Sequence, residues 1–131
     1  MIVGIGVDIV EVRRISKALQ GSASMVRKVF TPAEIEYCQA RKNQYQHFAG
    51  RFAAKEAALK ALGTGWQEGI GWRDVEVIPA ELGKPDLKLH GKALSFFKAC
   101  GADRAFVSIT HAEAYATAMV VLEGNNGGPP G

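Results

Sequence analysis

Stretches of alternating and β-branched residues mark the strands that the chain is expected to form. Residues 2–12 are rich in Val and Ile and predict a buried strand at the start of the chain. Residues 104–111 and 115–123 have the same character, and the short interval between them predicts a hairpin. Two further strands are expected at 72–78 and 87–89, on either side of a turn that contains Gly and Pro.

Helical patterns fill most of the intervals between these strands. A short basic helix is expected from Arg13 to Leu19. A second helix starts at Thr31-Pro32 and runs to about Ala40, because Thr is a good N-cap and Pro suits the first helical position. The longest helical pattern runs from His47 to Leu62 and stops at Gly63-Thr64-Gly65. An amphipathic helix is expected from Gly91 to Ala99.

This order of elements predicts an α+β fold, with a mostly antiparallel sheet packed on a long helix. The chain has 131 residues, enough for a single domain, which we place at residues 1–123. Residues 124–131 consist of Gly, Asn and Pro and are expected to form a disordered tail. A sheet of few strands leaves apolar surface uncovered in so small a chain, which favours an oligomer.

Composition narrows the function classes and the expected location. The net charge of +3 is too weak to indicate nucleic acid as a partner, and no apolar run is long enough to span a membrane. The first residues lack the charged leader of a secretion signal. The two cysteines, Cys38 and Cys100, lie far apart and are expected to be reduced thiols. We therefore expect a cytoplasmic protein.

Asp8 is the first residue that its predicted strand does not explain. It interrupts an otherwise apolar run and shares one face with Gly4 and Gly6, which leave space beside its carboxylate. An unpaired buried charge is costly, so a cation, hydrogen-bond donors or water must lie nearby. A solvated strand end, or a contact to the start of the next helix, explains Asp8 equally well.

Glu56 is a second carboxylate, near the core-facing side of the long helix and in line with Phe52 and Leu59. Taken alone, it is best explained by an i, i+4 salt bridge with Lys60. Two carboxylates with room around them suit Mg²⁺, however, which proteins hold through one or two carboxylates while waters and substrate phosphates complete its coordination. Asp8 and Glu56 together therefore predict a magnesium site and a phosphate-bearing substrate.

Basic residues recur on the same helix, at Arg51, Lys55 and Lys60. A solvated cationic face is the usual explanation for such residues, and a pocket that neutralises a pyrophosphate is the functional one. A second basic group suits an acidic protein surface and contains Arg13, Arg14, Lys17, Arg27 and Lys28.

Polar residues also end the strand at 104–111. Ser108 and Thr110 share one face of this strand, and His111 follows them. Routine polar alternation explains the segment best, and a site for a phosphate or a base is the alternative. The chain lacks the Gly-x-Ser-x-Gly pattern of a Ser-His-Asp hydrolase and the Lys-Ser/Thr of a P-loop.

In these residues and their order, the chain resembles the holo-acyl-carrier-protein synthases, the short 4′-phosphopantetheinyl transferases. Gly4-Ile5-Gly6-Val7-Asp8 is similar to the first motif of this family, and residues 48–65, which contain Arg51, Lys55 and Glu56, are similar to its central motif. The remaining similar segments are Phe30-Thr31-Pro32-Ala33-Glu34, Gly83-Lys84-Pro85 and Val107-Ser108-Ile109-Thr110-His111. The resemblance extends from about Met1 to Glu123.

The resemblance implies a 4′-phosphopantetheinyl transferase fold and an activity. Such an enzyme transfers the 4′-phosphopantetheine group from coenzyme A to a serine of apo acyl carrier protein, and releases adenosine 3′,5′-bisphosphate, in fatty acid biosynthesis. The family is usually a homotrimer with active sites between subunits.

The resemblance also implies roles for individual residues. Asp8 and Glu56 would hold Mg²⁺, and Lys60 would stabilise the phosphate charge as a third catalytic residue. Arg14 would meet the carrier protein. The coenzyme A site would be lined by Arg51, Gly63, Ser108, Thr110 and His111.

Two other classes of function compete with this interpretation. A module that only binds coenzyme A or a nucleotide would keep the basic helix but would not need both carboxylates. A small RNA-binding domain would use the basic residues and exposed aromatic rings, whereas Phe96, Phe97 and Phe106 are more simply expected in the core.

Overall fold

The computed structural model describes residues 1–66, 69–79 and 83–124. Along these ranges the elements are β1 (Ile2–Glu11), α1 (Val12–Gln20), α2 (Ala23–Val29), α3 (Pro32–Gln39), α4 (Gln44–Leu62), β2 (Val75–Pro79), β3 (Pro85–Leu89), α5 (Gly91–Ala99), β4 (Arg104–His111) and β5 (Tyr115–Glu123). A 3₁₀ turn at Trp72–Asp74 precedes β2.

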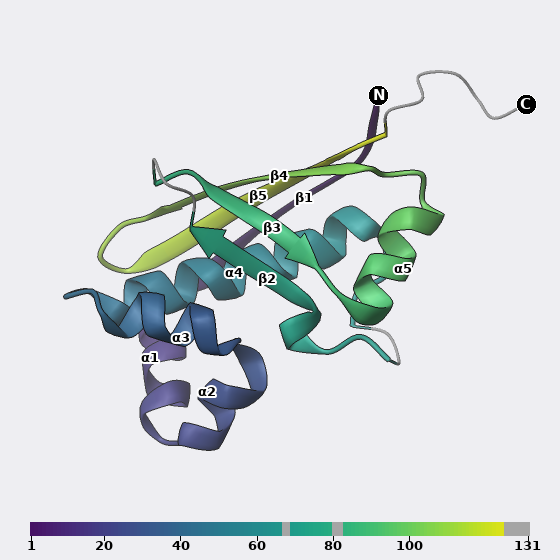
Figure 1. Ribbon diagram of the computed structural model, residues 1–131. Coiled ribbons are helices and arrows are strands. Elements are labelled where there is room, and N and C mark those ends of the chain that lie inside the picture. The colour runs from purple at the N-terminus through teal and green to yellow at the C-terminus, as the bar shows by residue number, and fades with distance from the viewer. Residues whose placement is uncertain (67–68, 80–82, 125–131) are drawn as a thin grey trace, which may run out of the picture.

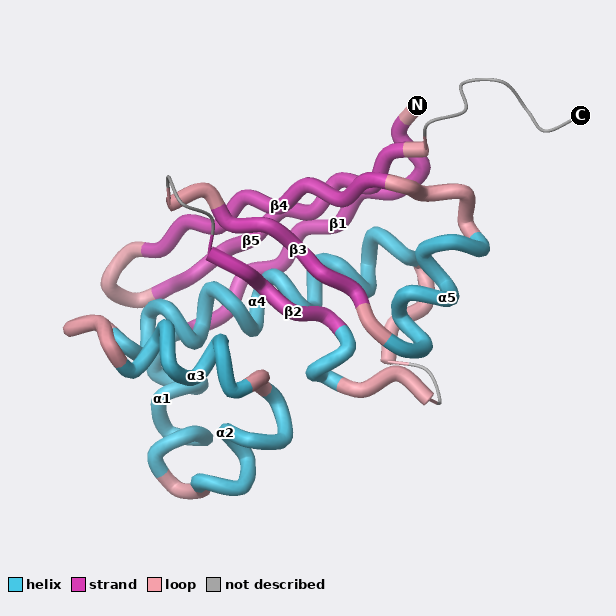
Figure 2. Tube along the Cα trace, in the orientation of Figure 1, coloured by secondary structure: helices cyan, strands magenta, loops and turns pink. Residues whose placement is uncertain are grey.

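All strand pairs are antiparallel, which confirms the predicted α+β fold. β1, β5 and β4 form one sheet in that order, and β2 pairs with β3 in a separate two-stranded sheet. The long helix α4 lies against the three-stranded sheet, and the β2–β3 pair crosses near it (Figure 1). Helices α1, α2 and α3 gather at one end of α4, and α5 lies near the other end (Figure 2).

Small residues allow β1 and α4 to approach closely. A Cβ atom added at Gly6 would overlap the carbonyl oxygen of Ala57, and one added at Gly4 would overlap that of Ala61. The strand therefore packs directly on the helix backbone. The space that the two glycines were expected to leave open beside Asp8 is filled by α4.

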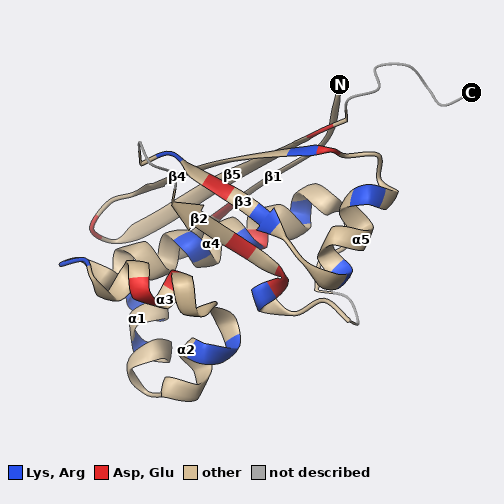
Figure 3. Cartoon of the chain, in the orientation of Figure 1, with Lys and Arg blue, Asp and Glu red and all other residues tan. Residues whose placement is uncertain are grey.

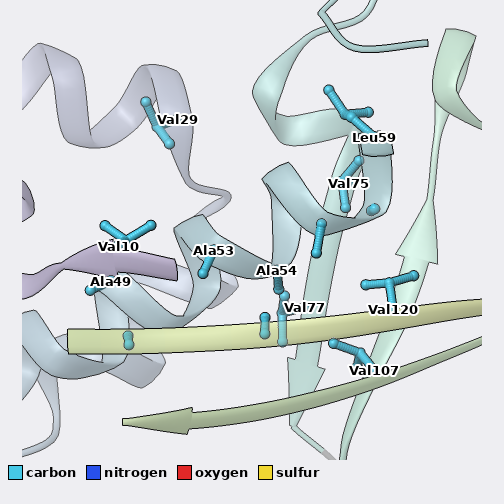
Figure 4. Close-up of a cluster of buried hydrophobic side chains, with 14 of the residues drawn as sticks. Val10, Val29, Ala49, Ala53, Ala54, Leu59, Val75, Val77, Val107 and Val120 are labelled. Carbon is cyan, nitrogen blue, oxygen red and sulfur yellow. The ribbon is translucent and has the colours of Figure 1, made fainter. Parts of the chain in front are cut away.

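The core forms around α4 and is built from short side chains. Figure 4 shows part of this cluster, with Ala49, Ala53 and Ala54 of α4 near valines from β1, β2, β4 and β5. Each of these three alanines is fully buried. Because alanine adds little volume, the sheet and the helix lie close enough for side chains from both to reach the same site.

Several local predictions differ from the structure. Helix α2 was not predicted, and Ser22 caps it by accepting a hydrogen bond from the backbone N–H of Met25. Trp72 to Asp74 form a 3₁₀ turn instead of the first part of a strand, because the Asp74 carboxylate accepts a hydrogen bond from the Gly71 N–H. The predicted core position of Phe106 is wrong, since the side chain is 37% exposed.

At the end of the sheet, the N–H of Gly124 donates to the carbonyl of Met1. The predicted disordered tail otherwise lies outside the described residues.

The outer face of the three-stranded sheet is apolar and exposed. Ile5, Val7 and Ile9 of β1 are each more than half exposed. The strand register continues this face across the sheet, from Val7 to Met119 of β5 and from Ile5 through Val121 of β5 to Phe106 of β4. Contiguous apolar surface of this kind commonly marks an interface.

Within the described ranges, none of the helices combines the length and the apolar composition that a membrane span requires.

Candidate functional site

Two of the predicted catalytic residues meet where β1 crosses α4. The Lys60 ammonium donates to Oδ1 of Asp8 over 3.1 Å and to the carbonyl oxygen of Val7 over 3.0 Å. Asp8 lies on the helix-facing side of β1, with its side chain 17% exposed, whereas Lys60 is 55% exposed. The salt bridge of Lys60 thus goes to Asp8 of the strand, and not to Glu56 as a purely helical explanation would require.

Glu56 lies one turn before Lys60 and shares its environment with Asp8. Burial raises the pKa of Glu56; a hydrogen bond from Trp66 lowers it, and the negative charge of Asp8 raises it further. The positive charges of Lys60 and Arg14 act in the opposite direction. Burial is the largest cause of the raised pKa of Glu56, and the negative charge of Asp8 adds to it, so a cation near both carboxylates would be stabilised.

Among the described residues, the candidate ligands for a metal ion at this place are the carboxylates of Asp8 and Glu56. In the described part of the chain, no group of three or more His, Cys, Asp or Glu side chains is arranged to hold a metal ion. A zinc site would require such a group. Two oxygen ligands from the protein fit Mg²⁺, provided that water and substrate phosphates supply the remaining ligands.

A second cluster surrounds Arg51 on another side of α4. Arg51 is 4% exposed, its guanidinium lies 3.9 Å from the ring centre of Tyr37, and its Nε atom has no hydrogen-bond partner among the described residues. The rings of His47 and His111 are 5.1 Å apart. Burial, and then the positive charges of His111, Arg51 and Arg41, lower the pKa of His47. These charges make the cluster suitable for an anion.

The Arg51 cluster encloses a cavity of about 130 Å³. Its lining comes from α3, α4, β4 and both ends of the β2–β3 connection: Tyr37, Gln46, His47, Gly50, Arg51, Pro79, Gly83, Pro85, Ile109 and His111. Two predicted coenzyme A residues, Arg51 and His111, are thus brought together. A larger hollow of about 550 Å³ between β3 and β4 contains none of the predicted site residues.

The other predicted coenzyme A residues lie elsewhere. Ser108 and Thr110 are exposed on the outer face of the sheet, opposite the face that packs on α4. Gly63 ends α4 with φ 76°, in the left-handed region that glycine adopts without strain. At 100° per residue, Arg51 and Glu56 point to sides of the helix about 140° apart. In a single copy of the chain, the predicted site residues therefore lie in separate regions of the molecule.

Lys55 cannot serve in a phosphate pocket, contrary to the sequence-based hypothesis. Its ammonium is fully buried and forms an ion pair with Glu34, which is also fully buried, over 2.9 Å. It also donates to the carbonyl oxygens of Trp72 and Val75. All three of its hydrogens are thereby used within the protein.

Three residues near the two clusters were not assigned from the sequence. Gln46 and His47 line the Arg51 cavity, although nothing in their local pattern indicated a site. Trp66 donates a hydrogen bond to Glu56 from the loop after α4. The local signal available for Trp66 was a large aromatic residue directly after Gly63-Thr64-Gly65.

Comparisons with known proteins identify the family of the chain. The family model of the 4′-phosphopantetheinyl transferase superfamily matches residues 4–120. A holo-[acyl-carrier-protein] synthase of Geobacter sp. (strain M21) is 52% identical over 124 residues, which cover 94% of this chain and 99% of the relative. The chain belongs to the 4′-phosphopantetheinyl transferase superfamily.

Solved structures extend the similarity to the fold. The crystal structure of holo-[acyl-carrier-protein] synthase from Neisseria meningitidis matches with a TM-score of 0.83 and 34% identity, over 94% of this chain and 99% of that one. The Helicobacter pylori holo-[acyl-carrier-protein] synthase, solved in complex with coenzyme A, matches with a TM-score of 0.79 and 28% identity, over 91% and 99% of the respective chains.

Proposed function

We propose that this chain is a holo-[acyl-carrier-protein] synthase. It transfers the 4′-phosphopantetheine group from coenzyme A to a serine of apo acyl carrier protein and releases adenosine 3′,5′-bisphosphate. The observation that carries this proposal is the meeting of Asp8, Glu56 and Lys60 at the crossing of β1 and α4, in a chain that belongs to this superfamily. We place the reaction in the cytoplasm and in fatty acid biosynthesis.

Asp8 and Glu56 are the proposed ligands of Mg²⁺. Both are oxygen donors, and the raised pKa of Glu56, due to burial and then to the charge of Asp8, means that a cation between them would relieve an unfavourable interaction. When bound, Mg²⁺ would neutralise charge that develops on the diphosphate of coenzyme A during transfer.

The chain's own residues would position the substrates and balance their charge. Lys60 is largely exposed and already near Asp8, so its ammonium can turn to a phosphate oxygen at little cost. Glu56, acting through a water molecule, is the candidate acceptor of the carrier serine proton, because the attacking hydroxyl requires a base within reach. Phosphoryl transfer requires mostly this kind of positioning and charge neutralisation.

The Arg51 cavity is the proposed site for another phosphate of coenzyme A. Its buried guanidinium, with an Nε–H that no described residue accepts, favours an anion. This cavity and the Asp8–Glu56 pair face different sides of one copy. We therefore propose a homotrimer, in which the carboxylates of one subunit and the Arg51 cavity of its neighbour form one complete site. The exposed apolar face of the sheet supplies the contact surface.

Light scattering on the purified chain tests this assembly. We expect a particle of about three times the 14.1 kDa chain mass, because a second and third copy would cover Ile5, Val7 and Ile9. Val7→Lys should shift the mass toward that of one chain and lower activity. A wild-type chain that is monomeric and fully active would contradict the shared site.

Arg14 is proposed to contact the carrier protein. It is exposed on α1, further basic residues are found on α1 and α2 (Figure 3), and its charge reaches Glu56. Carrier proteins with acidic surfaces would be attracted to this end of the molecule.

Arg14→Glu is expected to raise the KM for the carrier protein by about tenfold, equivalent to about 1.4 kcal/mol, with a smaller change in the KM for coenzyme A. Steady-state kinetics with each substrate varied in turn measure the two effects. Lys98→Glu on α5, also exposed, is the matched control for charge reversal and should leave both constants unchanged. Equal kinetics for Arg14→Glu and the wild type would remove Arg14 from the carrier surface.

Mass spectrometry of a carrier protein tests the function itself. Apo acyl carrier protein incubated with the chain, coenzyme A and Mg²⁺ should gain the mass of one phosphopantetheine group at its serine. Omission of Mg²⁺ and addition of a chelator should suppress the gain. A carrier protein that stays unmodified, while coenzyme A binds to the chain, would favour a binding module without transferase activity.

A further inference from the structure

Trp66 makes a direct contact with one of the proposed magnesium ligands. Its indole N–H donates to Oε2 of Glu56 over 3.3 Å. This donor is neutral, so it orients the carboxylate without cancelling the negative charge that a cation needs. It engages one of the two carboxylate oxygens and leaves the other to be offered to a metal ion.

The Trp66 ring is held by a stack that begins on the same helix as Glu56. Its centre lies 3.7 Å from that of Trp72, and the Trp72 ring stacks on Phe52 with centres 5.0 Å apart. Phe52 precedes Glu56 by one turn of α4. The rings of Phe52, Trp72 and Trp66 therefore form a stack, called the aromatic bridge below. It starts at Phe52 on α4 and ends at Trp66, whose N–H contacts Glu56 on the same helix.

The aromatic bridge is also fixed to the buried core. The carbonyl oxygen of Trp72 accepts a hydrogen bond from the Lys55 ammonium over 3.1 Å. Lys55 in turn forms the buried ion pair with Glu34. The backbone of Trp72, which carries the middle ring of the aromatic bridge, is therefore anchored by a fully buried ion pair.

We propose that Trp66 is a positioning residue for Glu56: its indole N–H holds the carboxylate in the orientation that binds the divalent cation. This inference rests on the proposed function, because it takes Glu56 as a magnesium ligand. Hydrogen bonds to metal-ligating carboxylates commonly change metal affinity by tenfold or more.

The two tryptophans of the chain provide a direct measurement. Each indole N–H gives its own signal in a ¹⁵N-edited NMR spectrum, and Trp72 serves as the internal reference. Titration of the wild-type chain with Mg²⁺ in the presence of coenzyme A should shift the Trp66 signal more than the Trp72 signal. Glu56→Gln should abolish this difference. An unshifted Trp66 signal, in a chain that Mg²⁺ binds and activates, would overturn the inference.

Trp66→Phe separates the hydrogen bond from the stacking, because phenylalanine keeps a ring against Trp72 and removes the N–H. We expect about a tenfold weaker binding of Mn²⁺, used as a paramagnetic substitute and measured by electron paramagnetic resonance with coenzyme A present. The Mg²⁺ concentration for half-maximal activity should rise by a similar factor, while kcat at saturating Mg²⁺ stays close to that of the wild type. Circular dichroism establishes that the variant is folded.

The outcomes distinguish the inference from the function on which it rests. If Trp66→Phe binds Mn²⁺ as tightly as the wild type, the positioning role is wrong and the transferase proposal stands. If the wild type transfers phosphopantetheine without any divalent ion, the magnesium assignment fails, and the role of Trp66 fails with it.

Discussion

Glu56→Gln and Asp8→Asn are each expected to lower kcat/KM for phosphopantetheine transfer by about a thousandfold while leaving the fold intact. Each substitution keeps the size of the side chain and removes one negative charge. A metal ion that stabilises a developing charge contributes several kcal/mol, and about 4 kcal/mol corresponds to a thousandfold in rate. The mass gain of the carrier protein over time measures the effect.

The design of these variants separates chemistry from folding. The Asn of Asp8→Asn retains an oxygen that can accept the hydrogen bond from Lys60, which spans 3.1 Å in the wild type. Glu56 is only partly buried and can be replaced by a neutral amide at little cost in stability. Glu36→Gln on α3 is the matched control, since it removes an exposed helical carboxylate that is not part of the proposed metal site. Normal turnover by either site variant would refute the metal assignment.

The metal binding of these variants provides an independent check. Mn²⁺ affinity measured with coenzyme A present should fall in both Glu56→Gln and Asp8→Asn, and stay unchanged in Glu36→Gln. A loss of activity without a loss of Mn²⁺ affinity would assign the two carboxylates to a role other than metal binding.

The meeting of Asp8 with α4 could be predicted only in part from the sequence. Period-2 alternation correctly placed Gly4, Gly6 and Asp8 on one face of β1. It did not reveal that a helix backbone would fill the space above the glycines, because Ala57 and Ala61 are more than 50 residues away in the chain. The local alternation determines on which face of the strand a side chain lies, whereas long-range packing determines which residues that face contacts.

The basic residues of α4 illustrate the same limit. Arg51 and Lys55 are one turn apart and look equivalent in the sequence, yet Arg51 lines a cavity and Lys55 is sealed in the core. The difference arises from Glu34, which is 21 residues before Lys55. The capping position of Glu34 was a local signal, since its carboxylate bonds the Thr31 N–H at the start of α3. Its second role as the partner of Lys55 depends on how α3 packs against α4.

Lys55→Met is expected to lower the free energy of unfolding by about 3–5 kcal/mol, a large share of the 5–15 kcal/mol typical of a small domain. Methionine fills a similar volume but removes the ammonium. Glu34 would then remain fully buried as an unpaired charge, with only the backbone N–H groups of Thr31 and Val77 as donors. The carbonyl oxygens of Trp72 and Val75 would also lose their shared donor.

Urea denaturation followed by circular dichroism measures this loss. The double variant Lys55→Met/Glu34→Gln should recover part of the stability, because no isolated charge stays in the core. Lys98→Met, which removes an exposed lysine on α5, should change stability by less than about 0.5 kcal/mol. If Lys55→Met were as stable as Lys98→Met, the buried ion pair would not be a main support of the α3–α4 packing. The anchoring of Trp72, and through it the orientation of Glu56, would then need another cause.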